Sequence, residues 1–113
     1  MSQNIALLTL TVVASAAVAS QRFVGYDGAP SGAGDVALGV SRSDADTGDA
    51  LPVDTIGTSI VESGAAITKG DSLEPDADGR AVPDSAGGNP QSARALEDAS
   101  AAGEPIEVLL LTA

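Results

Sequence analysis

One short motif recurs three times in this chain: a glycine, an acidic residue, any residue and then Leu or Ile, which begins an alternating segment. The three copies span residues 47–53, 69–75 and 102–108. Glycine enters turns of positive φ that other residues resist. Alternation of aliphatic and other residues is typical of a half-buried strand. The sequence therefore predicts a small β scaffold whose strands begin at glycine-led turns.

We expect a mainly β fold, a small compact β-barrel or β-sandwich of short antiparallel strands with an extended N-terminal strand. The 113 residues suffice for one domain. Gly57 lies between two strand-like segments and predicts a bulge or a tight bend. Further segments with strand patterns span residues 8–13, 22–26, 36–41, 51–56, 58–62, 67–75 (broken at Gly70), 80–82 and 106–111.

The first and third copies belong to a longer echo at an offset of 55 residues. It matches Val40 with Ala95, and it continues through the pairs Gly48/Gly103, Asp49/Glu104, Leu51/Ile106 and Val53/Val108. The echo favours a strand near residues 94–96 followed by a turn. A helix over residues 92–102 that ends at Gly103 is the alternative.

Residues 5–19 form a run of apolar and small side chains. Ala17, Val18 and Ala19 are compatible with a signal-peptide cleavage site. No Lys or Arg precedes the run, and hydroxyl side chains interrupt it, so it is too polar to span a bilayer. Its β-branched residues favour a strand. Because both faces of that strand would carry apolar groups, we expect it to contact protein on both sides.

The composition excludes several functional classes. The net charge is −11, with 5 Lys and Arg against 16 Asp and Glu. This balance disfavours nucleic-acid binding, which needs a basic footprint. Without Cys or His, the chain has no thiol nucleophile and no ordinary zinc ligands. Two aromatic residues and many small side chains limit the core, so we expect self-association to add stability.

Acidic residues supply the main candidate chemistry, because the order Lys69-Gly70 does not fit a phosphate-binding loop and Ser63 lacks the pattern of a nucleophile elbow. Two carboxylates, Asp54 and Glu62, could form a pair for glycoside hydrolysis, but acids on strand surfaces are usually solvated. Cation binding is conceivable at two further groups, although their spacing is that of ordinary turns. These groups are Asp44, Asp46 and Asp49, and Asp76 and Asp78. We therefore expect no enzyme activity, no metal site and no cofactor.

The chain resembles the small capsid decoration (cement) proteins of tailed bacteriophages and related prokaryotic viruses. The resembling segments are residues 4–12, 38–40, 48–53, 62–67, 76–81 and 102–108. They span nearly the whole chain and contain turn and strand patterns without a reactive group. The resemblance implies a compact β domain that binds the outside of an assembled head, often as a trimer.

On this interpretation, residues 1–13 form a docking arm and residues 14–113 a single β domain. The arm would add a strand to the edge of a major capsid subunit or of a sister protomer. Its docking residues would be Asn4, Ile5, Ala6, Leu7, Leu8, Thr9 and Leu10. Leu109 and Leu111 lie opposite the expected core face and would support a homotrimer.

The expected partner is thus the major capsid protein, at the outer surface of the virion, without nucleic acid or membrane. The alternatives are a secreted or surface-layer β module and a viral tail or fibre component. For the core, we expect one interior that contains Leu51, Val53, Ile106, Val108 and Leu110, with Glu107 facing solvent.

Overall fold

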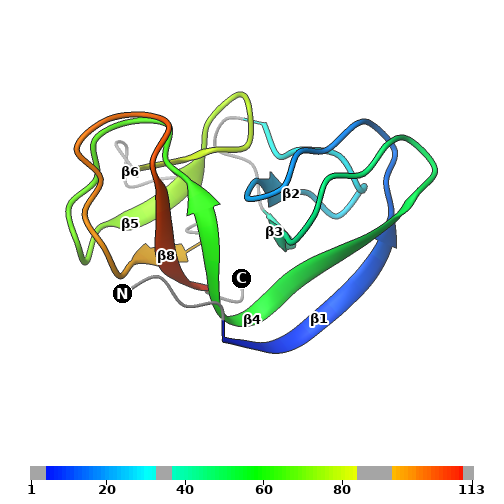
Figure 1. Ribbon diagram of the computed structural model, residues 1–113, viewed down its shortest axis with the longest axis horizontal. Helices are drawn as coiled ribbons and strands as arrows, with labels where there is room; N and C mark the ends of the chain where they lie inside the picture. The colour runs from blue at the N-terminus through cyan, green and yellow to red at the C-terminus, as the bar shows by residue number, and fades with distance from the viewer. Residues whose placement is uncertain (1–4, 33–36, 84–92, 111–113) are drawn as a thin grey trace.

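Eight antiparallel strands form a nearly closed barrel in the computed structural model, which describes residues 5–32, 37–83 and 93–110 (Figure 1). The strands are β1 (Ala6–Val13), β2 (Phe23–Val24), β3 (Gly39–Ser41), β4 (Ala50–Glu62), β5 (Ser72–Pro75), β6 (Ala81–Pro83), β7 (Ala93–Ala95) and β8 (Pro105–Leu110). Their order is β2-β3-β4-β8-β7-β5-β6, and β1 pairs with β4. The expected all-β fold with an N-terminal strand is confirmed.

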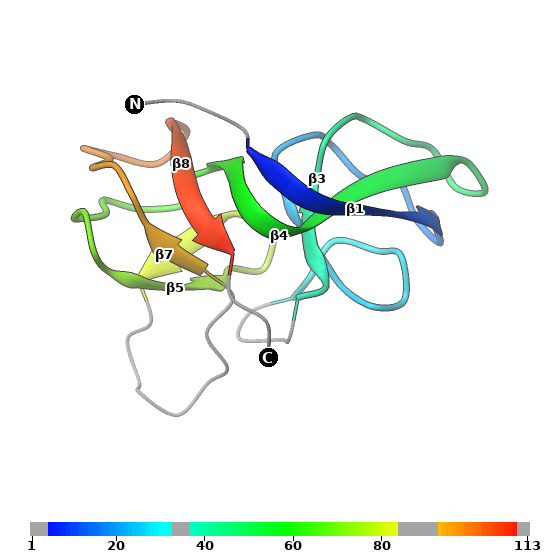
Figure 2. The same ribbon diagram turned by 90° about the horizontal axis from the view of Figure 1, so that it is seen from below.

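The long strand β4 connects two halves of the barrel and bends between them (Figures 1 and 2). Its first part pairs with β1 and β3, and its second part pairs with β8. Gly57 lies at the bend with a φ of 108°. A Cβ there would lie 2.2 Å from the carbonyl oxygen of Ile5. Because the β1–β4 register also shifts at this level, the predicted irregularity at Gly57 is confirmed.

The two halves, residues 5–56 and 58–110, repeat one strand register. In the first half Thr9 lies opposite Asp54, and in the second half Thr58 lies opposite Leu109. The pairing of β2 with β3 recurs between β5 and β7, and that of β3 with β4 recurs between β7 and β8. Residues 58–62 of β4 therefore occupy in the second half the place that β1 occupies in the first.

Four equivalent turns lie next to these strand pairs. In one of them, Gly70 donates its N–H to the carbonyl of Ala95, and Ala95 returns its N–H to the carbonyl of Asp71, at 2.8 and 2.9 Å. The same pair of hydrogen bonds recurs in the other three turns. The residues of positive φ in the four turns are Gln21, Gly48, Gly70 and Gly103. The three motif glycines thus occupy turns, as predicted.

The acidic residue of the motif closes its own turn. The Asp49 carboxylate accepts the N–H of Asp46 at 3.1 Å, and the Asp71 carboxylate accepts that of Thr68 at 2.9 Å. Glu104 does the same for the N–H of Ala101. These bonds satisfy amides that the turn would otherwise leave unpaired.

The fourth turn departs from this pattern in two residues. Gln21 has a φ of 62° and is the only described residue other than glycine with positive φ. Arg22 follows it in place of the acid and forms an ion pair with Glu62 at 3.0 Å. An acid at this position would be repelled by the Glu62 carboxylate, whereas the positive charge of Arg22 pairs with it.

We predict that Gln21→Gly stabilises the protein. The left-handed conformation destabilises the fold by about 1–2 kcal/mol when the residue has a Cβ. Replacement by glycine removes this strain but costs about 0.5–1 kcal/mol, because glycine has more conformational freedom in the unfolded chain. The free energy of unfolding in urea should therefore rise by up to about 1 kcal/mol. The matched control is Gly70→Ala, where a Cβ would meet nothing within 4 Å and only the backbone strain is added. Loss of stability in Gln21→Gly would contradict the strain argument.

The hydrogen bonds of the turn at Glu104 predict a lowered pKa for this residue and a pH dependence of stability. The side-chain hydroxyl of Ser100, its backbone N–H and the Ala101 N–H hold the pKa of Glu104 below the usual 4.5. A lowered folded-state pKa adds stability above pH 4.5, and that stability is lost as the pH falls through the folded pKa. In an NMR titration, Glu104 should titrate below 4.5, and Ser100→Ala should move its pKa back up. An unchanged pKa in Ser100→Ala would contradict the assigned cause.

The expected core residues are all buried, but they belong to two clusters rather than one interior. Leu51 and Val53 pack with Ala14, Val18, Val24 and Ala45. The second cluster is larger and includes Ile106, Val108 and Leu110 together with Phe23, Val40, Val61, Ile67, Leu73, Ala81, Ala93, Ala95 and Ala99. The bend of β4 explains the division, because it carries the two ends of one strand into different parts of the barrel.

One local expectation was wrong. Glu107 is 1% exposed instead of solvent-facing. The segment after β7 covers it, because Leu96 donates to its carbonyl and its own N–H donates to the Glu97 carboxylate at 2.7 Å. The favoured strand near residues 94–96 is confirmed as β7, and the described residues 96–102 that follow it contain bends and no helix, so the helix alternative is wrong. Residue 92 lies outside the described residues.

Candidate docking surface

Strand β1 is the most exposed apolar element that the structure describes. Leu7 is 76% exposed and Val13 69%, and Ile5, Leu8 and Leu10 are also exposed. Within β1 only Val12 packs against a core cluster. We expected protein on both faces of this strand, whereas the single chain leaves most of both faces uncovered. A strand of this kind offers apolar area to a partner.

A buried carboxylate attaches β1 to the rest of the molecule. Asp54 of β4 is fully buried, and its two oxygens accept the hydroxyls of Thr9 and Ser59, each at 2.9 Å. The Nε of Arg42 lies 3.4 Å from the same carboxylate. The Thr55 hydroxyl also donates to the carbonyl of Leu8. The expectation of a solvated Asp54 was wrong, and these partners offset the cost of its burial.

The outer edge of β1 is uncovered near Thr9 and Thr11, whereas Gly28 lies against its end: a Cβ on Gly28 would lie 2.3 Å from the carbonyl oxygen of Val13, and Ser15 donates its N–H to the Gly28 carbonyl. Ala14 donates its N–H to Asp49 of the neighbouring chain segment. Since peptide groups alternate in direction along a strand, Leu10 and Val12 also point toward β4. Thr9, Thr11 and Val13 then point away, and no strand among the described residues pairs with that edge.

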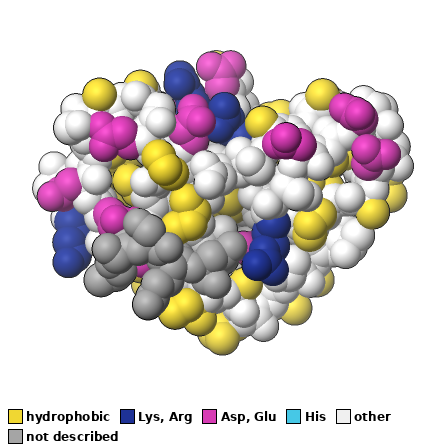
Figure 3. Space-filling view, viewed as in Figure 1, with side chains coloured by type: hydrophobic (Ala, Val, Ile, Leu, Met, Phe, Trp, Pro, Cys, Tyr) yellow, Lys and Arg dark blue, Asp and Glu magenta, His cyan; other side chains and the backbone are white. Residues whose placement is uncertain are grey.

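Charge is distributed away from this strand. No charged side chain precedes Arg22 in the sequence. In Figure 3 hydrophobic side chains lie along the lower rim, where β1 and β4 run, and acidic side chains lie along the upper part of the molecule and at its left and right ends. The protein has a net charge of −11, yet the side chains of β1 carry no charge. This contrast was available from the sequence, but only the fold shows that the neutral segment is an exposed edge.

The predicted docking and self-association residues meet at the start of β1. Thr58 pairs with Leu109, which is 41% exposed, and Thr58 also donates its N–H to the carbonyl of Ile5. Ile5 and Leu109 thus both neighbour Thr58. Residues Ile5 to Leu10 of the predicted docking set are described. Asn4 and Leu111 lie outside the described residues.

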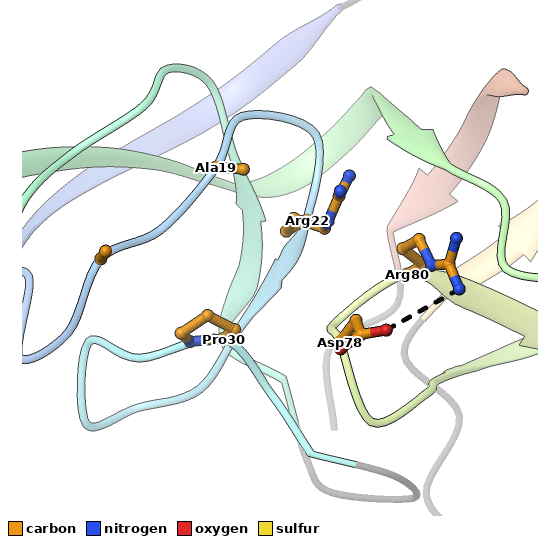
Figure 4. A pocket seen from close by; sticks show the side chains of 6 residues that line it. Ala19, Arg22, Pro30, Asp78 and Arg80 are labelled. Atoms are coloured by element: carbon orange, nitrogen blue, oxygen red, sulfur yellow. Dashed lines mark ion pairs between the residues drawn. The ribbon is translucent and has the colours of Figure 1, made fainter. Parts of the chain in front are cut away.

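A pocket of about 350 Å³ lies between the two halves (Figure 4). It is lined by Ala17, Ala19, Arg22, Pro30, Asp78 and Arg80. Glu62 lies between the two guanidinium groups, 3.0 Å from Arg22 and 3.8 Å from Arg80. Arg80 also pairs with Asp76 and Asp78. The charges around the pocket therefore compensate one another, and the candidate pair Asp54 and Glu62 is divided between two separate sets of partners.

Four of the five candidate cation ligands interact with groups of the same chain: Asp44, Asp49 and Asp76 accept backbone amides, and Asp78 pairs with Arg80. Asp44 accepts the N–H of Ser20 at 2.7 Å, and Asp76 accepts those of Asp78 and Arg80. Within residues 5–32, 37–83 and 93–110, no cluster of three or more acidic residues could hold a metal ion. No helix in the described part of the chain has the length and hydrophobicity to cross a membrane.

Comparisons with known proteins agree with this architecture. A family model described as Phage cement protein matches residues 1–110. The fold is similar to the crystal structure of the head fibre gp8.5 N base in bacteriophage phi29, with a TM-score of 0.76 and 23% sequence identity. That match covers 92% of this chain and 93% of the other. No curated protein matches the sequence.

Proposed function

The chain belongs to the phage cement protein family, and from this membership we propose that it decorates the outer surface of a tailed-virus head and bridges major capsid subunits. The observation that carries the proposal is β1, an uncharged apolar strand exposed on a strongly acidic molecule. The fold similarity to a base that is named as part of a head fibre also supports a position on the head.

In this proposal β1 is the element that contacts the capsid. Burying one Leu or Ile side chain contributes about 1.5–3 kcal/mol, so a few such contacts per copy suffice. Many copies on one shell add their contributions, because each binds only the assembled head. The docking residues would be Asn4, Ile5, Ala6, Leu7, Leu8, Thr9 and Leu10. Residues 1–13 would then act as a docking arm on the β domain of residues 14–113.

The role is mechanical rather than catalytic. The carboxylates that could perform acid–base chemistry bind hydroxyls, amides or guanidinium groups of their own chain. The acidic ends of the molecule would face water and keep decorated particles apart. No cofactor is needed for such a role.

Leu7→Asp tests the docking surface. We predict that it weakens binding to heads assembled from the major capsid protein of the same virus by about 100-fold, because it removes apolar contact and buries a charge. Tyr26→Asp is the matched control, since it makes the same charge change at a residue that is 68% exposed and lies outside β1. Binding is measured by co-sedimentation. Equal binding of Leu7→Asp and the wild type would contradict the proposal.

Self-association, as a trimer, is the second part of the proposal. Leu109 is exposed beside β1, and Leu111 would extend the same side of the strand. A closed ring of three suits three-fold positions of a capsid lattice without open growth. Each copy carries a charge of −11, so added salt should tighten the contact.

Sedimentation at low and high salt measures this directly. We predict a trimer that becomes more populated with salt, and its loss in Leu109→Asp. A single monomeric species at both salt concentrations, at micromolar protein, would contradict self-association in solution.

A second candidate role is the base of a head fibre. The fold similarity to the gp8.5 N base spans nearly the whole of both chains, and it favours this role over a tail component. Cryo-EM of the virion distinguishes a cement protein from a fibre base. A cement protein ends at its globular density, whereas a fibre base carries a projecting element.

A further inference from the structure

The two halves of the molecule differ in what covers one strand. In the second half, residues 58–62 of β4 have neighbours along both edges. One edge pairs with β8, and on the other edge Glu62 donates its N–H to Gln21. The equivalent strand of the first half is β1, where Val13 corresponds to Glu62. One edge of β1 pairs with β4, and no described strand covers the other.

This open edge lacks the features that usually protect edge strands. Soluble proteins prevent such edges from pairing with other chains by placing Lys or other charged residues there, or by placing Pro there. Residues 5–13 include none of these. The outward peptide groups of Thr9 and Thr11 and the N–H of Val13 form a row that ends where Gly28 lies against the Val13 carbonyl, and the side chains beside them are largely exposed on both faces. An edge that is open, uncharged and apolar on both faces fits a further β-strand better than it fits a flat surface.

We infer that the outer edge of β1 accepts an extended, uncharged segment of the major capsid protein as an added β-strand. The inference rests on the proposed function and specifies the mode of that contact. Main-chain hydrogen bonds to Thr9, Thr11 and Val13 supply the affinity, and apolar side chains of the added strand continue the two faces of β1.

Charge favours a capsid strand over a second copy of this chain as the occupant. Pairing of two β1 edges would bring together two molecules of charge −11. Such a pairing is also isologous, so it closes as a dimer and consumes the edge that would bind the head. A neutral capsid strand carries neither disadvantage.

Amide hydrogen exchange, read by NMR or by mass spectrometry with electron-transfer fragmentation, tests the inference on the full-length protein. In the free protein, the N–H groups of Thr9, Thr11 and Val13 should exchange fast, whereas those of Leu10 and Val12, bonded to β4, should be protected. On heads assembled from the major capsid protein, the first three should slow by at least 100-fold. Two substitutions add an independent readout.

Thr11→Pro removes the outward N–H and leaves the bonds to β4, so the protein should fold and bind heads at least tenfold more weakly. Thr11→Ala keeps the N–H and should bind within threefold of the wild type. If heads bind while the three amides stay unprotected, the edge inference is wrong and the proposed function stands. If protection appears with protein concentration alone, the occupant is a second copy, which also overturns the inference. If wild-type protein does not bind heads, both fail.

Discussion

The backbone pairing of β4 is the constraint on which the rest of this fold depends. Thirteen residues of one strand serve as the last strand of the first half and as the first strand of the second. Gly57 makes this possible, because its conformation and its lack of a Cβ allow the strand to bend beneath Ile5. One core cluster includes Leu51 and Val53 from the first part of β4, and the other includes Val61 from its second part together with Phe23 and Val40 of the first half. Residues 58–62 of β4 have internal neighbours on both edges, whereas no described strand pairs with the outer edge of β1, which Gly28 contacts at Val13.

Much of the fold could be predicted from the sequence, because turn chemistry is local. The motif glycines and the acids after them identified three turns, the alternation after the third copy indicated the strand that is β8, and the echo favoured the strand that is β7. The equivalence of residues 12–22 with residues 61–71 was not predicted from the sequence. Its remaining signal is weak: Val12, Ala16, Ala17 and Val18 match Val61, Ala65, Ala66 and Ile67. The turn of this segment has Gln21 and Arg22 where the motif has glycine and an acid. Its residues also match at an offset of 49, whereas the echo from Gly48 to Val53 has an offset of 55.

Burial of polar groups depended on tertiary contacts and could not be predicted from alternation. Glu107 has the spacing of a solvent-facing residue, yet residues 96–97 cross over it. Asp54 looks like a surface acid until β1, β3 and β4 bring Thr9, Ser59 and Arg42 around it. The proposed docking surface has a signal in the sequence, since a long uncharged segment in an acidic chain is visible there. Its outer edge became apparent only from the pairing of β1 with β4.

The central claim is that β1 is the surface through which this cement protein binds a capsid. The most direct measurement is a cryo-EM reconstruction of the virion at a resolution that places side chains. The account predicts the chain on the outside of the head, with β1 against a capsid subunit and the acidic turns at 46–49 and 101–104 in solvent. A chain bound through those acidic turns, with Leu7 and Val13 exposed to water, would contradict it.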